Sequence, residues 1–417
     1  MLLRTELSKF AIVIATAFTL IITSVTASAG SREKAKRIHD RLAGVPASQA
    51  VLDDMVSDID GIGDGSGTFD GTPAGAAYTA MQNSAFYNVT LKNFAMPWTN
   101  REFTVFAPLN DYVATFIGMV RDDVPMNQAL SADILYIGSG GSIPAYSNSD
   151  NAHYEALDDQ GVNLRDNLIQ TTQSAVTGLD SSATAGLMTT RAAAKSFFIA
   201  GTNRAMFRFT MLNHLCHDME QVADITRAPD RIRQDVSRSP GGDSRIFLNN
   251  CIGCHSGMDA MAQAFAYYDF AFDADNDPEA ENGIMTYNGP GVVDEVTGTR
   301  VHSKYFNNNS NFDPGFVTLD DRWSNYWRAG QNKLLGWSDP SEAMRHGNGA
   351  KSLGEELANS EAYARCQVEK VFRAVCLRDP VDAGDRGQID TMIGDFITSN
   401  YNLKQPFAQS ALFCSGS

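Results

Sequence analysis

The sequence predicts a mainly α-helical protein in which a short segment with two cysteines and a histidine is embedded between two larger helical parts. Apolar residues recur every three or four positions over several long stretches, a spacing that is typical of helices. Hydrophobic residues make up 43% of the 417 residues and charged residues 20%, a balance that supports a large core. A CxxCH pentapeptide, residues 251–255, lies between the two helical parts.

The N-terminus has the organisation of a signal peptide. Basic Arg4 and Lys9 precede an apolar run from Phe10 to about Val25, and Ala27-Ser28-Ala29 is a small-residue cleavage site. The alternative is an uncleaved anchor, since the run approaches the length that crosses a bilayer. Cleavage after residue 29 predicts a periplasmic or extracellular protein without a membrane span. The mature chain then divides into helical residues 30–195, a central segment 196–290, and helical residues 291–417.

The first helical part begins with two short helices between residues 31 and 59, because apolar side chains recur there at helical spacing. The Gly/Asp-rich stretch 60–75 predicts a loop, because the calcium-loop template of an EF-hand fails when counted from Asp58. Residues 76–140 show amphipathic helical runs broken by prolines. The pattern from residue 189 to 225 predicts a helix whose buried stripe includes Cys216 and Met219.

The pentapeptide Cys251-Ile252-Gly253-Cys254-His255 predicts covalent attachment of one c-type haem. Two thiols at this spacing can add to the two vinyl groups on one edge of a porphyrin, and the adjacent imidazole then reaches the iron. Cys251 and Cys254 would be the thioether anchors and His255 the proximal ligand. The alternatives are a redox CxxC pair, a zinc site and a disulfide. A redox pair needs a preceding buried strand, and zinc needs companion ligands, neither of which the sequence offers.

Candidates for the sixth iron ligand are His214, His217, Met219 and His302, for each of which a structural role is the competing interpretation. Met285, Met344 and His346 are further candidates that the sequence does not rank. Met258 and Met261 follow His255 on the same helix, so they lie on the proximal side of the ring and are expected to pack the core.

Arginines suit the two haem propionates, because guanidinium pairs with carboxylate through two hydrogen bonds. Arg238 and Arg245, which flank a Pro-Gly-Gly turn shortly before Cys251, are the candidates for this role. Otherwise they are solvated loop charges.

In the C-terminal part, Trp323 and Trp327 are spaced four residues apart and are expected in the core rather than as a haem wall. A helical stripe from Leu357 to Val375 ends at Asp379-Pro380, and a second helix covers about 385–398.

The four remaining cysteines predict two disulfides in an oxidising compartment. Cys366 and Cys376 lie on one helix, about 15 Å apart, and cannot pair with each other. Cys216 therefore pairs with Cys366 or Cys376, and Cys414 takes the cysteine that is left.

The charge balance, 33 basic against 49 acidic residues, gives a formal net charge of −16. This charge argues against nucleic acid as a partner. A basic redox partner protein is compatible with it, and so is a purely solubilising role. The sequence leaves oligomerisation open.

The run "CIGCHSGMDAMAQAFAYYDF" resembles the C-x-x-C-H-x-x-M-D-P-x-x-x-A-F-x-x-F-D pattern of large exported bacterial CxxCH proteins of the planctomycete type, which are built from consecutive domains of unknown function. The stretches "RDDVPMNQALSADILYIG" and "LANSEAYARCQVEKVFRAVCLRDP" are similar to other parts of that group. Ala260 replaces the usual proline of the pattern. The resemblance implies the haem triad Cys251, Cys254 and His255 and carries over no catalytic residue.

The expected function is electron transfer by an exported mono-haem c-type cytochrome. Because an electron shuttle needs only about 100 residues, a typical domain, the larger size of this chain calls for another role. The alternatives are a haem enzyme of peroxidase or oxygenase type with an open or weak sixth position, and a structural or assembling redox protein.

Overall fold

The computed structural model describes residues 30–62, 71–140, 142–232, 244–306, 315–342 and 344–416. Within these ranges the chain is mainly helical, which confirms the predicted class, and its strands form three two-stranded antiparallel sheets. The expected signal peptide, residues 1–29, and Arg238 lie outside the described residues. Among the residues that are described, no helix has the length and apolar character needed to cross a bilayer.

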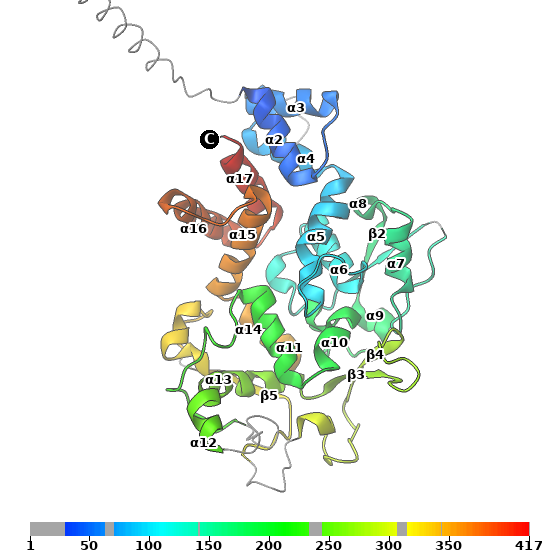
Figure 1. Cartoon of the computed structure of the whole chain (residues 1–417), viewed down its shortest axis with the longest axis vertical. Helices are drawn as coiled ribbons and strands as arrows, with labels where there is room; N and C mark the ends of the chain where they lie inside the picture. Colours follow the sequence, from blue (N-terminus) through cyan, green and yellow to red (C-terminus); the bar gives the residue numbers. More distant parts are fainter. Residues whose placement is uncertain are drawn as a thin grey trace, which may run out of the picture.

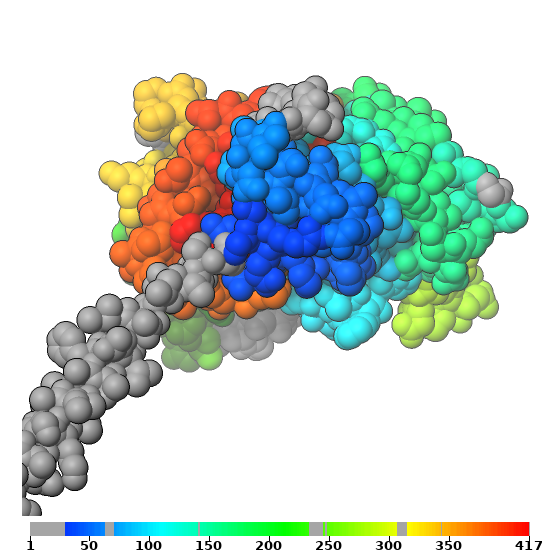
Figure 2. Space-filling view, turned by 90° about the horizontal axis from the view of Figure 1, so that it is seen from above, coloured from blue at the N-terminus to red at the C-terminus, as the bar shows by residue number. Residues whose placement is uncertain are grey.

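The first and last described helices pack together at one end of the molecule (Figures 1 and 2). Side chains of Ser48 and Thr72 cap the second and third helices by accepting hydrogen bonds from amides one turn later, as serine and threonine commonly do. Arg41 donates to the carbonyl of Val375 and so ties the first helix to the C-terminal part. This end comprises α2 (Ser31–Ala43), α3 (Gln49–Ile59), α4 (Pro73–Met81) and α17 (Lys404–Ser415).

Residues 86–128 form the helical runs that their apolar spacing predicts. The helical prediction is wrong for the next element, because Leu135–Gly138 is strand β1, paired with β2 (Leu168–Thr171). The buried Leu135 and Tyr136 satisfy their backbone polar groups in part through this pairing. The helices of this part are η1 (Phe86–Leu91), α5 (Lys92–Ala95), η2 (Met96–Thr99), α6 (Asp111–Arg121), η3 (Met126–Gln128), α7 (Ala152–Asp159), α8 (Leu164–Asn167) and α9 (Gln173–Thr177).

The helix expected from 189 to 225 is broken, so that prediction is wrong. Gly201, with φ of +104°, separates two short helices, and Cys216 takes the left-handed conformation that ends the second run. From Cys216 onward the chain is a loop up to Ile232, the last residue described before a gap. The elements here are η4 (Gly186–Thr189), α10 (Arg191–Phe198), α11 (Asn203–Thr210) and η5 (Met211–Leu215).

The CxxCH segment lies at the opposite end of the molecule from α2 and α17 (Figure 1). The helical spacing after the motif holds as far as Phe265, whereas Tyr268 begins a strand and is not helical. The elements of this segment are α12 (Ser244–Ile246), η6 (Phe247–Cys251), α13 (Ile252–Ala262), η7 (Gln263–Phe265), β3 (Tyr268–Phe272), β4 (Gly283–Tyr287) and η8 (Ser303–Tyr305).

In the C-terminal part, Trp323 and Trp327 are fully buried, which confirms the expectation that they belong to the core. The stripe from Leu357 to Val375 spans two helices rather than one, because Ser360 caps a new helix. The elements are β5 (Arg322–Asn325), η9 (Tyr326–Arg328), η10 (Gln331–Leu335), β6 (Arg345–Asn348), α14 (Gly349–Ala358), α15 (Glu361–Cys376) and α16 (Ala383–Thr398).

Two disulfides join the parts of the chain. Cys216 pairs with Cys366, and Cys376 pairs with Cys414, which selects one of the two patterns that the sequence allows. The first bond connects the loop after η5 to the middle of α15 across 150 residues, and the second connects α15 to α17. One apolar cluster runs from Ala35 to Ala411, so residues from all three predicted parts share a continuous core.

Candidate functional site

The CxxCH motif lies at the start of α13. Cys251 is the N-cap residue of this helix, and Cys254 and His255 belong to its first turn. The preceding elements are the short helix α12 and the π-helical turn η6, not a strand. Cys251 and Cys254 are both half-buried thiols that take no part in either disulfide. The two sulfur atoms and the imidazole therefore come from positions 251, 254 and 255, at the start of one helix.

His255 is held by a buried carboxylate one turn further along α13. Its Nδ1 lies 3.0 Å from Oδ1 of Asp259, and the side chain of Asp259 is fully buried while that of His255 is 19% exposed. Asp259 also receives two hydrogen bonds of 2.7 Å from Nε and Nη2 of Arg204 on α11. The result is a chain of three polar groups, Arg204, Asp259 and His255, which fixes the orientation of the imidazole.

The charge state of Asp259 decides the tautomer of His255. Burial alone would raise the pKa of Asp259, but the positive charge of Arg204 and the hydrogen bond from His255 outweigh it, so the pKa lies well below its usual range. An ionised carboxylate only accepts hydrogen bonds. Nδ1 of His255 therefore carries the proton, and in the neutral imidazole Nε2 bears the lone pair that a metal would use.

The loop after η5 packs directly on the motif. The amide of Asp224 donates to the carbonyl of Gly253 at 2.9 Å, and Sγ of Cys254 lies 3.4 Å from the carbonyl oxygen of Met219. Cγ2 of Ile225 lies 3.3 Å from the position of a Cβ atom on Gly253, so a methyl group at this site would require the Ile225 side chain to shift slightly. On the other side of the motif, Ile232 packs against Cys251 and Ile252.

Three apolar side chains next to the motif are left exposed. Ile225 is 77% exposed, and Leu248 and Ile246, just before Cys251, are 53% and 42% exposed. Large aliphatic side chains gain free energy when an apolar surface covers them. Exposed aliphatic side chains next to two unpaired thiols fit the residues that a covalently attached haem would need.

The thiols do not have the features of a redox-active pair. Burial raises the pKa of the Cys254 thiol, and the negative charge of Glu220 acts in the same direction. Reactive thiols of the thioredoxin type follow a strand, whereas this motif follows the helical segments α12 and η6, and the raised pKa of Cys254 is the opposite of the lowered pKa of a reactive thiol. The described part of the chain also contains no group of three or more His, Cys, Asp and Glu side chains that could hold a metal ion.

The histidines proposed as sixth ligand lie in three different places. His214 is buried, with its Nε2 hydrogen-bonded to the hydroxyl of Tyr112 at 2.7 Å and its ring packed against Trp98, and burial lowers its pKa well below the usual value. The amide of His302 donates to the carbonyl of Ala266, which lies beyond the C-terminal end of α13, whereas His255 lies in the first turn of that helix. Neither has a contact with the motif among the described residues.

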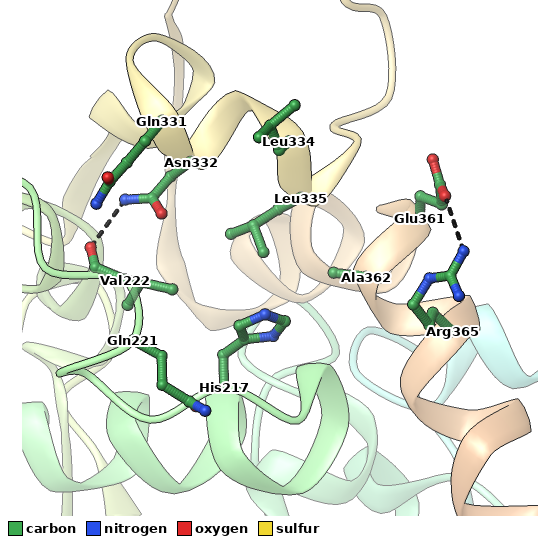
Figure 3. Close-up of a pocket in the computed structure, with 10 residues that line it drawn as sticks. All are labelled: His217, Gln221, Val222, Gln331, Asn332, Leu334, Leu335, Glu361, Ala362 and Arg365. Atoms are coloured by element: carbon green, nitrogen blue, oxygen red, sulfur yellow. Dashed lines mark hydrogen bonds and ion pairs between the residues drawn. The ribbon is translucent and has the colours of Figure 1, made fainter. Parts of the chain in front are cut away.

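His217 and Met219 lie in the loop that packs on the motif. Because η5 ends at Leu215, between His214 and His217, these two histidines do not share a helix face. Met219 touches Cys254 through its backbone carbonyl, and its side chain is buried. Nδ1 of His217 lies 2.6 Å from the carbonyl oxygen of Leu215, and its ring lines a cavity on the far side of the loop (Figure 3).

Of the two arginines proposed for the propionates, only Arg245 is described; it is exposed on α12. Sequence reasoning missed Arg204 and Asp259. The spacing of Asp259 four residues after His255 was a usable signal, because such residues share one helix face. Arg204 lies 51 positions before His255, and only the packing of α11 on α13 brings it there.

Comparison of the chain with protein-family models, with curated proteins and with solved structures finds no match.

Proposed function

We propose that this protein is a c-type cytochrome, a carrier of one covalently attached haem. The observation that carries the proposal is the first turn of α13, where two unpaired thiols and an imidazole with its Nδ1 held by Asp259 occupy a CxxCH motif. Cys251 and Cys254 would form the thioethers and Nε2 of His255 would bind the iron. When bound, the group supplies an iron that cycles between ferric and ferrous states.

Its physiological role would be electron transfer outside the cytoplasm, with a redox partner protein. Signal-peptide features at residues 1–29 and two disulfides support an oxidising compartment. Asp259 has a specific part in this role, because a carboxylate that accepts from Nδ1 makes the imidazole a stronger electron donor and stabilises the ferric state. Arg204 would moderate this effect by drawing negative charge from the carboxylate.

The test of the haem is chemical. Protein from a periplasmic expression host that matures c-type cytochromes should keep its colour after acid-acetone extraction, and mass spectrometry should show one haem on a chain that starts near Gly30. Cys254→Ala should leave single attachment or none. Cys376→Ala is the matched control, since it removes a half-cystine outside the motif and should keep both thioethers. Colourless protein, or pigment that organic solvent extracts completely, refutes the proposal.

The role of Asp259 has its own readout. Asp259→Asn should raise the reduction potential, because an amide accepts more weakly from Nδ1 and the imidazole then stabilises the ferric state less. An unchanged potential would show that the carboxylate acts only structurally. Binding of cyanide or carbon monoxide to a high-spin iron would favour a haem enzyme, while a low-spin iron that ignores both ligands favours the electron carrier.

A further inference from the structure

A cavity of about 350 Å³ lies behind the loop that packs on the CxxCH motif (Figure 3). Three elements form its walls, namely loop residues 217–222, η10 and the first turns of α15. The disulfide between Cys216 and Cys366 joins two of these walls, because one cysteine precedes the loop and the other follows the lining residues of α15. The loop and α15 are therefore covalently linked, whereas η10 is held by hydrogen bonds.

The same loop contacts both the motif and this cavity. On the motif side of the loop, Met219 and Asp224 contact Cys254 and Gly253 through the two bonds described above. On the other side, Gln221 and Val222 line the cavity.

A second path connects the cavity to α13. Asn332 donates from its side chain to the carbonyl of Val222 at 2.8 Å, and Trp337 donates from its indole to the carbonyl oxygens of both Asn332 and Trp327, each at 3.0 Å. The ring of Trp327 in turn packs on Gly257, the residue two positions after His255. These side chains are buried, so they connect η10, one wall of the cavity, to the motif helix α13 through packed contacts.

The lining has an apolar part, formed by Val222, Leu334, Leu335 and Ala362, and a polar part, formed by His217, Gln221, Gln331, Asn332, Glu361 and Arg365. The Leu215 carbonyl can only accept a hydrogen bond, so Nδ1 of His217 carries the proton and Nε2 of the neutral ring is an acceptor. The imidazole points into the centre of the cavity, below Leu335 and beside Ala362 (Figure 3). Leu334 is 83% exposed at the rim. An imidazole facing aliphatic side chains suits a flat ring that carries a hydroxyl group.

We propose that this cavity binds a small hydroxylated aromatic reductant of the diphenol class, which delivers electrons to the site at α13. The proposal rests on the haem proposed above. Oxidation of a hydroquinone to a quinone releases two electrons and two protons. A single iron would accept one electron at a time, so the redox partner protein must reoxidise it before the second electron leaves the ligand. Each proton would pass from the hydroxyl to Nε2 of His217 and then to solvent. His217 would be the catalytic base of this transfer.

Binding is tested without any redox chemistry. Resorcinol is the probe, because its 1,3-hydroxyl groups do not give a quinone, and isothermal titration calorimetry of the full chain is the measurement. His217→Leu should weaken binding about tenfold through loss of one hydrogen bond. Gln221→Trp should abolish it by filling the cavity from its exposed edge. Gln160→Trp, at an exposed glutamine that ends α7, is the matched control and should bind as the parent does. Absence of saturable binding, or equal binding by all variants, overturns the proposal.

Electron delivery is tested by stopped-flow reduction with hydroquinone, followed at the haem bands. The rate should saturate with hydroquinone, resorcinol should compete, and both effects should disappear in Gln221→Trp, while dithionite reduces every variant at one rate. A linear rate that resorcinol does not change overturns the proposal although the haem stands. Protein without haem bands that still binds resorcinol refutes the electron carrier and leaves the ligand site. A changed haem spectrum in His217→Leu would identify His217 as an iron ligand and overturn its role as base.

Discussion

Removal of Arg204 should destabilise the fold strongly, because it leaves Asp259 buried without its main partner. The Asp259 side chain is fully buried and that of Arg204 is 14% exposed, and the pair makes two hydrogen bonds of 2.7 Å. Breaking a buried pair of this kind costs about 3–5 kcal/mol in the free energy of unfolding. Arg204→Met keeps most of the side-chain volume, so the loss reports the charge rather than a cavity.

The same helix provides the control. Arg208 makes two hydrogen bonds of 2.7 and 2.6 Å to Asp218, but its side chain is 47% exposed, and exposed pairs contribute roughly 0.2–1 kcal/mol. Arg208→Met should therefore lower the free energy of unfolding by less than about 1 kcal/mol. The assay is guanidinium unfolding followed by tryptophan fluorescence, with both variants compared at equal slope.

The double variant Arg204→Met/Asp259→Leu should recover much of the loss, since apolar replacement of both partners is often nearly neutral. Equal losses for Arg204→Met and Arg208→Met would refute the argument, and so would a double variant that is less stable than Arg204→Met alone.

Three further outcomes follow from the packing. Replacing Cys216 and Cys366 by serine should lower the free energy of unfolding by about 5 kcal/mol, and replacing Cys376 and Cys414 by about 4 kcal/mol, because the first disulfide closes the longer loop. Chemical denaturation of the two variants measures this order, and the reverse order would contradict the prediction. Gly257→Ala should lower the free energy of unfolding by about 1–3 kcal/mol, since the new methyl would lie 1.9 Å from the indole nitrogen of Trp327. Gly394→Ala, where no atom lies within 4 Å of the new methyl, should raise it by several tenths of a kcal/mol. Equal melting temperatures of the two variants would contradict this prediction. Burial, and to a smaller extent the neighbouring Arg373, lowers the pKa of Lys370 to about 7. Between pH 7 and 10.5 the unfolded chain therefore binds more protons than the folded chain, and the free energy of unfolding rises with pH. Lys370→Met should flatten this rise, which unfolding curves at pH 7, 8.5 and 10 would show.

Several helices and the CxxCH motif could be predicted from the sequence, because they depend on residues that are close together in the chain. The helices at 31–59 and 383–398 follow from apolar spacing and turn signals close to them in the chain. The CxxCH motif is also local, since both cysteines and the histidine lie within one helical turn. The exclusion of a bond between Cys366 and Cys376 needed only the rise of a single helix.

Other features required the tertiary structure, because their causes are distant in the chain. The apolar stripe through Cys216 resembles a helix, yet the disulfide to Cys366 and the left-handed conformation of Cys216 place it at a helix end. The strand at 135–138 depends on a partner at 168–171 that apolar spacing does not reveal. Contacts between remote segments compete with local preference and override it here.

The same division applies to the candidate site. The sequence by itself determined the thiols, the imidazole and their spacing, since one turn of helix fixes all three. Only the tertiary structure decided that Arg204 meets Asp259 behind His255, and that the loop on the motif has a cavity on its other side. The physical reason is that hydrogen bonds and cavities form between side chains that folding brings together, and residue spacing along the chain does not encode those distances.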